Sequence, residues 1–158
     1  IEDFEDINVK FETTINNKAE WRSSHRSTDS ASYIFEGIHS GMGVLDTANN
    51  YFQIITKQSF EEIPKDGMPV FIELDFKTNT TIVLSVMSYK NGIGESTDLI
   101  YLNPTVEWKK IYINLTSTIS YDVNSNEYKF LLSANHASGL EKSVVLIDNF
   151  KLVYRKVD

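Results

Sequence analysis

The stretch VFIELDFKT, residues 70–78, alternates apolar and polar side chains with a period of two. Successive residues of a β-strand point to opposite faces, so this alternation predicts a strand with one face in the core and one toward solvent or a cleft. The residues expected in the core are Val70, Ile72, Leu74 and Phe76. The opposite face carries two carboxylates, Glu73 and Asp75, which we expect to be solvated.

The same period recurs through most of the chain, between clusters of Asn, Gly, Asp, Ser and Pro. Clear examples are YFQIITKQSF (51–60), TIVLSVMSY (81–89), WKKIYINL (108–115) and EYKFLLSA (127–134). No segment of about eleven residues or more keeps a helical period, which predicts that helix is a minor component. Half-apolar strands need a second layer to cover them, so the sequence predicts an all-β fold, a two-sheet antiparallel β-sandwich of jelly-roll type.

One connection is longer than compact domains normally contain. Residues 16–32, NNKAEWRSSHRSTDSAS, hold one large apolar side chain, Trp21, among polar ones. Loops of this length without regular structure are more often functional or mobile than accidental. We therefore expect a long loop at this place.

Composition limits the domain count and the partners. The chain has 158 residues, 41% hydrophobic and 12% aromatic, which suits one well-formed core, so we expect a single domain over residues 1–158. Because it begins with Ile1 rather than Met, we expect a piece of a longer protein. Lys and Arg number 15 against 22 Asp and Glu and are scattered, which argues against nucleic acid and against anionic membrane surfaces. The absence of cysteine excludes a disulfide framework, a zinc–thiolate site and a thiol nucleophile.

Four stretches together carry a resemblance to a known family. They are DFED (3–6), PVFIELDFKTNT (69–80), VEWKKIYINLTSTI (106–119) and VVLIDNFKLVYRK (144–156). Together they resemble the carbohydrate-binding-module-like jelly rolls, galactose-binding-like β-sandwiches of secreted or surface proteins from Bacteroides-type bacteria. The resemblance implies a non-catalytic module of a polysaccharide-utilisation surface protein, either secreted, periplasmic or held at the cell surface as a lipoprotein. It also implies an oligo- or polysaccharide as partner, together with neighbouring domains of the same chain.

The resemblance further implies a structural calcium ion. In many such modules, a Glu in an FE context near the start and an Asp in an ID context in the last strand hold calcium together with backbone carbonyls. Glu5 and Asp148 match these two positions. Calcium takes about six to eight oxygen ligands, which paired first and last strands could bring together. The alternative is that Asp148 and Asn149 form a bulge or turn and bond nearby backbone amides.

The carboxylates of residues 70–78 invite comparison with an enzyme. Laminarinase-like glycoside hydrolases share the jelly-roll fold and carry Glu-x-Asp-x-x-Glu on one strand. Glu73 and Asp75 fit the first two positions, but Thr78 stands at the third. A retaining glycosidase needs two carboxyl groups about 5 Å apart, one as nucleophile and one as acid/base. The sequence therefore predicts a non-enzyme, with a divergent glycoside hydrolase as the less favoured alternative.

Other motifs give no catalytic signal. His25, His39 and His136 are widely separated and show no metal-ligand spacing. The segment GIHSGMG (37–43) has three glycines, but it lacks the strand–turn–helix context of a phosphate-binding loop.

Two surfaces could hold a sugar through aromatic rings and neighbouring polar groups. The first is a loop region with Trp21, Arg22, His25, Arg26 and Tyr51. The second is the open face of a sheet, with Phe71, Glu73, Tyr89, Tyr112 and Asn114.

Each of these assignments has a plainer alternative. Trp21 could equally be a lid over the end of the core, and Trp108 is assigned a structural role. The rival function is a structural or protein-interaction domain that docks against a neighbouring domain. An exposed coplanar aromatic pair would favour glycan binding, and its absence would favour the scaffold.

Overall fold

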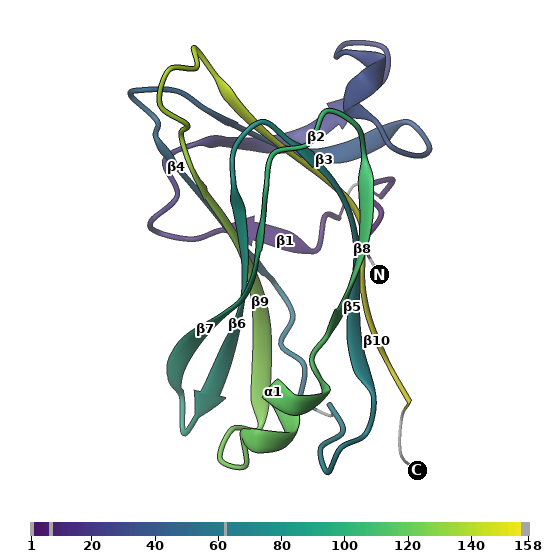
Figure 1. Cartoon of the computed structure of the whole chain (residues 1–158), viewed down its shortest axis with the longest axis vertical. Helices are drawn as coiled ribbons and strands as arrows, with labels where there is room; N and C mark the ends of the chain where they lie inside the picture. The colour runs from purple at the N-terminus through teal and green to yellow at the C-terminus, as the bar shows by residue number, and fades with distance from the viewer. Residues whose placement is uncertain (1, 7, 62, 156–158) are drawn as a thin grey trace.

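The computed structural model describes residues 2–6, 8–61 and 63–155, and its strands form two facing layers (Figure 1). The first sheet has the order β1 (Phe11–Thr13), β4 (Tyr51–Thr56), β9 (Glu127–Asn135), β6 (Ile82–Lys90) and β7 (Ile93–Leu102). The second sheet has the order β2 (Glu20–His25), β3 (His39–Leu45), β10 (Ser143–Tyr154), β5 (Val70–Thr78) and β8 (Lys109–Asn114). Every pairing between these strands is antiparallel. The predicted two-sheet jelly-roll sandwich is confirmed.

The core lies between the two sheets, and the alternation of the sequence explains how it forms. The buried residues predicted for β5 are Val70, Ile72, Leu74 and Phe76, and all four lie in the core. The first sheet contributes the matching inward residues of β9 and β6, which include Phe130, Leu132 and Leu84. Apolar side chains on one face of each sheet thus meet in a single layer, as period-two patterning requires.

Helix is a minor component, as predicted. Residues 2–6, 8–61 and 63–155 contain a short 3₁₀ turn, η1 (Ala31–Tyr33), and one α-helix, α1 (Thr116–Tyr121), which lies between the sheets at one end of the sandwich (Figure 1). In the described part of the chain, no helix is long and apolar enough to cross a membrane. Position 156, the end of the predicted last strand, lies outside the described residues.

The prediction of one long loop over residues 16–32 is wrong in part. Strand β2 lies inside this segment and pairs with β3 along its whole length. Trp21 of β2 packs on the core, with ring centroids 5.9 Å from Phe4 and 5.6 Å from Phe52. Alternation could not reveal this edge strand because Trp21 is its only large apolar side chain. Trp21 is therefore the lid over the core that the sequence left open.

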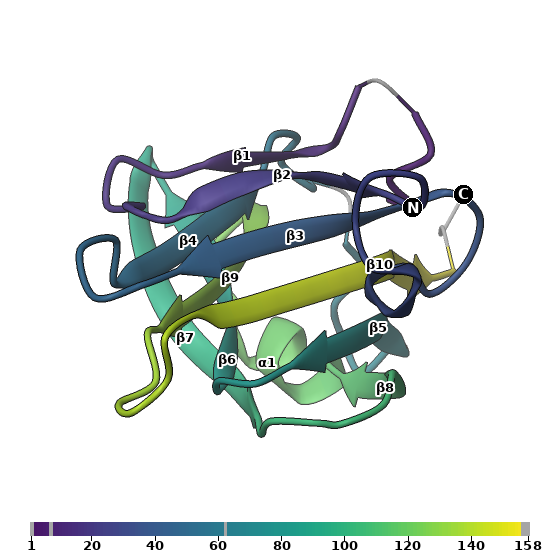
Figure 2. The same ribbon diagram turned by 90° about the horizontal axis from the view of Figure 1, so that it is seen from above.

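The rest of that segment, with the residues after it, forms a covering loop of residues 26–38 over the outer face of the second sheet (Figure 2). The Ser32 carbonyl accepts hydrogen bonds from the side chains of Lys77, at 3.3 Å, and Trp108, at 3.1 Å. The backbone N–H of Glu36 donates to Asp148 Oδ2 at 3.4 Å. Outward-pointing groups of this sheet therefore lie under a second layer of chain.

Asp75 shows the consequence most clearly. It points outward, opposite Asp148 on β10 and Lys110 on β8, as the alternation predicts. Yet its exposed fraction is 0%, and neither carboxylate oxygen has a hydrogen-bond partner. Lys110 Nζ lies 3.5 Å from Asp75 Oδ2. The expectation that Asp75 is solvated is wrong, because the outer face is covered there.

Candidate functional site

The residues predicted for a loop site are held by contacts within the chain. Arg22 binds Asp29 through two hydrogen bonds of 2.6 and 2.9 Å and also binds Glu20 at 2.9 Å. The side-chain hydrogen bonds from Arg22 hold the pKa of Asp29 well below its ordinary value. The His25 ring lies edge-on to His39, with centroids 4.7 Å apart. These contacts fasten the start of the covering loop.

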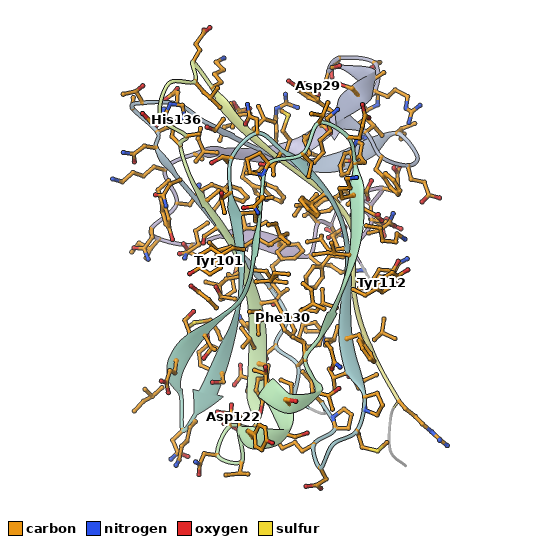
Figure 3. All side chains as sticks on the ribbon, viewed as in Figure 1. Asp29, Tyr101, Tyr112, Asp122, Phe130 and His136 are labelled. Atoms are coloured by element: carbon orange, nitrogen blue, oxygen red, sulfur yellow. The ribbon has the colours of Figure 1, made fainter. Side chains whose placement is uncertain are left out.

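Two more predicted site residues lie on the outer face of the second sheet. Tyr112 is opposite Glu73, and it is 67% exposed on the side of the molecule away from the first sheet (Figure 3). The Glu73 carboxylate accepts hydrogen bonds from Lys110 at 2.8 Å and Lys151 at 3.2 Å. Hydrogen bonding from Lys110 is the main cause that lowers the pKa of Glu73. Glu73 is thus an ionised group whose charge is already balanced.

The outer face of the first sheet is different, because Figures 1 and 2 show no other strand or helix beyond it. We call it the open face and define it by the outward-pointing residues of β4, β6, β7 and β9. They include Tyr51, Gln53, Ile55, Val83, Ser85, Met87, Tyr89, Ser96, Asp98, Tyr101, Glu127, Lys129, Leu131 and Ser133. Most of these side chains are half-buried without a covering layer. They therefore shield one another and form a continuous surface.

An oriented carboxylate lies on β7, the strand at one edge of the open face. Asp98 Oδ1 accepts a hydrogen bond from Ser85 Oγ at 2.8 Å, and Asp98 Oδ2 accepts one from Tyr101 OH at 2.6 Å. The bond from Tyr101 and then that from Ser85 lower the pKa of Asp98, so the group is ionised at neutral pH. Tyr101 remains 60% exposed. An exposed ring thus stands beside a fixed hydrogen-bond acceptor.

Tyrosines also stand toward the two ends of this face. At one end, Tyr51 OH and the Gln53 side-chain nitrogen are 2.9 Å apart, and Gln53 Oε1 accepts from Thr14 Oγ1 at 2.6 Å. At the other end, the Tyr89 ring lies against Gly94 of β7. A Cβ built on Gly94 would lie 2.8 Å from that ring, so the missing side chain lets the ring lie across the strand. The face therefore offers three rings with polar groups between them.

A cavity of about 390 Å³ opens at the Tyr51 end of the open face. Its walls include Val83, Tyr101, Ser133 and His136, and the His136 imidazole Nδ1 is 3.0 Å from Ser143 Oγ. Flat rings, hydroxyls, an amide and a carboxylate on a hollowed surface are the groups that recognise hydroxylated rings.

The structure regroups the predicted site residues. Tyr51 and Tyr89, assigned from sequence to two different surfaces, share the open face, whereas Glu73 and Tyr112 lie on the opposite side of the sandwich. Sequence reasoning missed Tyr101, Asp98 and Gln53. Alternation along LIYL, residues 99–102, could have pointed to Tyr101. Nothing local could have paired Asp98 with Ser85, because a strand irregularity sets that register.

The two predicted calcium ligands, Glu5 and Asp148, line the same cavity of about 470 Å³. Its other lining residues are Asp3, Glu36, Gly37, Asn149 and the cationic Lys151. Glu5 Oε1 accepts from the backbone of Ile38 at 2.8 Å and of His39 at 3.0 Å.

Asp148 also adopts the alternative geometry, a bulge. The β5–β10 register shifts between Asp148 and Lys151, and Asn149 has a φ of 49°. The Asp148 carboxylate accepts from Asn149 N and from Ser40 Oγ, both at 2.8 Å. Burial is the main cause that raises the pKa of Asp148 to about 6. Three donors already bind Asp148, and a cation would further offset the cost of the buried carboxylate. Among the described residues, however, no group of three or more His, Cys, Asp or Glu side chains is placed to hold a metal ion.

The chain was also compared with known proteins. No protein-family model matches its sequence, and no curated protein matches it. Its fold is similar to part of tailspike protein 4 of bacteriophage CBA120, at a TM-score of 0.65 and 8% identity, and to part of an exo-β-agarase, at 0.62 and 13%. These matches cover 96% and 99% of this chain but only 20% and 25% of the two larger proteins.

A further match is of similar size to this chain. It is the family 11 carbohydrate-binding module of a cellulosomal cellulase from Clostridium thermocellum, at a TM-score of 0.60 and 16% identity. The match covers 98% of this chain and 93% of that module. At such low identities the likeness shows the jelly-roll sandwich fold.

Proposed function

We propose that this domain binds carbohydrate without catalysis and that the open face is the binding surface. The observation that carries the proposal is the Ser85–Asp98–Tyr101 arrangement on an uncovered, half-buried sheet face. Sugars are held by rings that pack against their apolar faces and by acceptors that bind their hydroxyls. Tyr101 and Asp98 supply one of each, and Tyr51 and Tyr89 extend the surface along the sheet.

The similar folds support this reading and suggest probes. The family 11 module from C. thermocellum has been solved with a β-1,3-1,4-mixed-linked tetrasaccharide. A xylanase fragment from the same organism, which contains a module of similar fold, has been solved with xylohexaose. These two oligosaccharides are natural first ligands to test.

The charges around Glu73 favour a non-catalytic role. A glycosidase of the retaining kind needs one carboxyl group that carries a proton near neutral pH. Glu73 is bound by Lys110 and Lys151, and its lowered pKa keeps it ionised. Asp75, the second carboxylate of that strand, is buried away from solvent. We propose further that the domain belongs to an extracytoplasmic protein, secreted or at the cell surface, that takes part in polysaccharide use. In that protein it would lie beside other domains.

Titration calorimetry with the mixed-linked tetrasaccharide and xylohexaose tests the open face. We expect saturable binding of at least one ligand, weakened about tenfold or more by Tyr101→Ala and by Asp98→Asn, because the first removes the ring that packs on the sugar and the second replaces a charged acceptor by a neutral amide. Asp66→Asn, at an exposed turn between β4 and β5 and outside the strands of this face, is the matched control and should bind like the parent chain. Loss of binding in Tyr112→Ala with retention in Tyr101→Ala would move the site to the second sheet.

A second function, a structural or docking domain, is favoured by one observation. Among the ring contacts of the described residues, the stacked pair, Phe4 with Phe11, is buried, and the more exposed pair, Phe35 with Trp108, is tilted by 51°. Neither of these two contacts is the exposed coplanar pair that would favour glycan binding. If neither oligosaccharide binds in the titrations, this scaffold role becomes the better account of the fold.

We further propose that the cavity between Glu5 and Asp148 binds a structural calcium ion. A ligand that binds only the folded chain stabilises it by RT ln(1 + [L]/Kd), which is about 1.4 kcal/mol at tenfold excess over Kd. Calcium should then raise the melting temperature by about 3–6 °C, and a chelator should reverse the shift. Asp148→Asn should abolish the calcium response. An unchanged melting temperature across a calcium titration would leave Asp148 as a bulge former alone.

A further inference from the structure

One cavity lies away from the open face, at the end of the sandwich that carries α1. It has a volume of about 580 Å³, within the range of about 300–1,000 Å³ typical of small-molecule sites. One wall is the β6–β7 hairpin, and the other is α1 with the connection from α1 to β9. Figure 1 shows the hairpin splayed away from α1 at this end, and Figure 3 places Asp122 beside the gap. We call this cavity the hairpin cleft.

The hairpin wall changes chemistry along its length. The inward residues of β6 run from buried Leu84 and Val86 to Ser88 and then Lys90. The β7 partners of Val86, Ser88 and Lys90 are Thr97, Glu95 and Ile93, which line the same cleft. All residues of β7 from Ile93 to Asp98 are exposed, so the hairpin extends past the core. The positions that would hold core side chains hold hydroxyls and charges instead.

The opposite wall is fixed in place by its own contacts. Lys65 Nζ donates to the carbonyl of Asp122 at 2.6 Å and to the carbonyl of Ser125. The buried Tyr128 hydroxyl donates to the same two carbonyls, each at 3.4 Å. The Asp122 carboxylate accepts from Ser125 N at 3.1 Å. A wall held by so many bonds loses little freedom when a ligand binds, which favours affinity.

The lining determines which ligand fits. Glu95 and Asp122 are acceptors, Lys90, Asn91 and Asn124 carry donors, and the hydroxyls of Ser88, Thr97 and Thr118 do both. The two carboxylates outnumber the single lysine, which disfavours an anion, and Ile93 adds apolar surface at 78% exposure. A neutral molecule with many hydroxyls and an apolar face satisfies all of these groups.

We propose that the hairpin cleft is a second saccharide site, which takes a short neutral oligosaccharide between β7 and α1. The cleft uses the inward face of the β6–β7 hairpin, whereas the open face uses the outward one. The two sites therefore share strands but no ligand-contacting side chain. This inference extends the proposed function to a second site. Binding in the hairpin cleft does not require binding at the open face, so each site can be tested independently.

Amide NMR titrations of the whole chain with the mixed-linked tetrasaccharide and with xylohexaose test the two sites separately. We expect saturable shifts at Ser88, Glu95 and Thr97 on the hairpin and at Asn124 across the cleft. Glu95→Gln and Thr97→Val should each weaken these shifts about tenfold, because the first replaces a charged acceptor oxygen by an amide NH2 and the second removes a hydroxyl, both at exposed positions. The matched control is Glu141→Gln, an exposed carboxylate in the β9–β10 connection at the other end of the fold.

The outcomes separate this inference from the open-face proposal. Cleft shifts that persist in Tyr101→Ala support a second site, even if the open face binds nothing. Shifts confined to Tyr101, Asp98 and their neighbours would overturn the cleft while leaving the first proposal intact. An unperturbed spectrum at both places would overturn both. Cleft signals that broaden with protein concentration in the absence of sugar would assign this surface to self-association and also overturn the inference.

Discussion

Replacement of Phe130 by alanine is expected to destabilise the fold by about 3–5 kcal/mol, the usual cost of truncating a fully buried phenylalanine. Phe130 is 0% exposed and lies at the centre of the core between the sheets (Figure 3). Its ring centroid is 5.7 Å from that of Phe60 and 6.0 Å from that of Phe150. Because Phe150 belongs to β10, this contact joins the first sheet to the second.

Urea denaturation measures the effect, and two variants calibrate it. Phe130→Leu keeps most of the buried volume, so it should cost clearly less than the alanine variant. Tyr112→Ala removes an aromatic ring that is 67% exposed, and it should change the free energy of unfolding by less than about 0.5 kcal/mol. A loss below about 1 kcal/mol in Phe130→Ala would contradict the central place of this ring.

The burial of Phe130 could be predicted from the sequence, because alternation is a local property of a strand. In EYKFLLSA, residues 127–134, every second residue from Tyr128 to Ala134 lies in the core. The same holds for VFIELDFKT, where each expected core residue is buried. The number of layers follows from these faces, since apolar faces require cover. The two-layer architecture can therefore be predicted from the alternation of apolar and polar residues alone.

The sequence pattern does not predict to which of the two sheets each strand belongs. Alternation tells which residues of a strand point outward, but it does not tell to which sheet the strand belongs. Tyr89 and Tyr112 both point outward as predicted, yet β6 and β8 lie in different sheets and their side chains face opposite ways. The open face forms because long-range pairing brings its strands together. That Tyr51, Tyr89 and Tyr101 share this face can therefore be known only from the order of strands in the sheet.

The outward direction also proved different from exposure to water. Asp75 points away from the core, as the alternation predicts, and Asp148 is opposite it on β10, yet both are buried. The reason lies in residues 26–38, whose polar sequence reads as a surface loop but which fold over the second sheet. Loop placement depends on a few distant hydrogen bonds rather than on any periodicity, so the local pattern carries no sign of it.

For the replacement of Gly41 by valine, the sequence and the structure predict opposite changes in the free energy of unfolding. Valine suits strands better than glycine, so intrinsic preference expects Gly41→Val in β3 to stabilise the fold. A Cβ on Gly41, however, would lie 2.6 Å from the Trp21 ring and 2.7 Å from the Phe4 ring. Both rings pack on the core and would have to move. We expect the variant to lose about 3 kcal/mol of unfolding free energy, at the upper end of the cost of overpacking.

A double-mutant cycle identifies the cause of that loss. If the clash with Trp21 is responsible, Gly41→Val should cost less in a Trp21→Leu background, with a coupling of at least about 1 kcal/mol. Thr13→Val, an exposed position on edge strand β1, controls for the general effect of valine in a strand and should change little. Strictly additive losses would show that the ring does not occupy the space above Gly41. The two glycines of GMG, residues 41–43, then have a packing role, since a Cβ on Gly43 would lie 2.6 Å from the buried Phe52 ring.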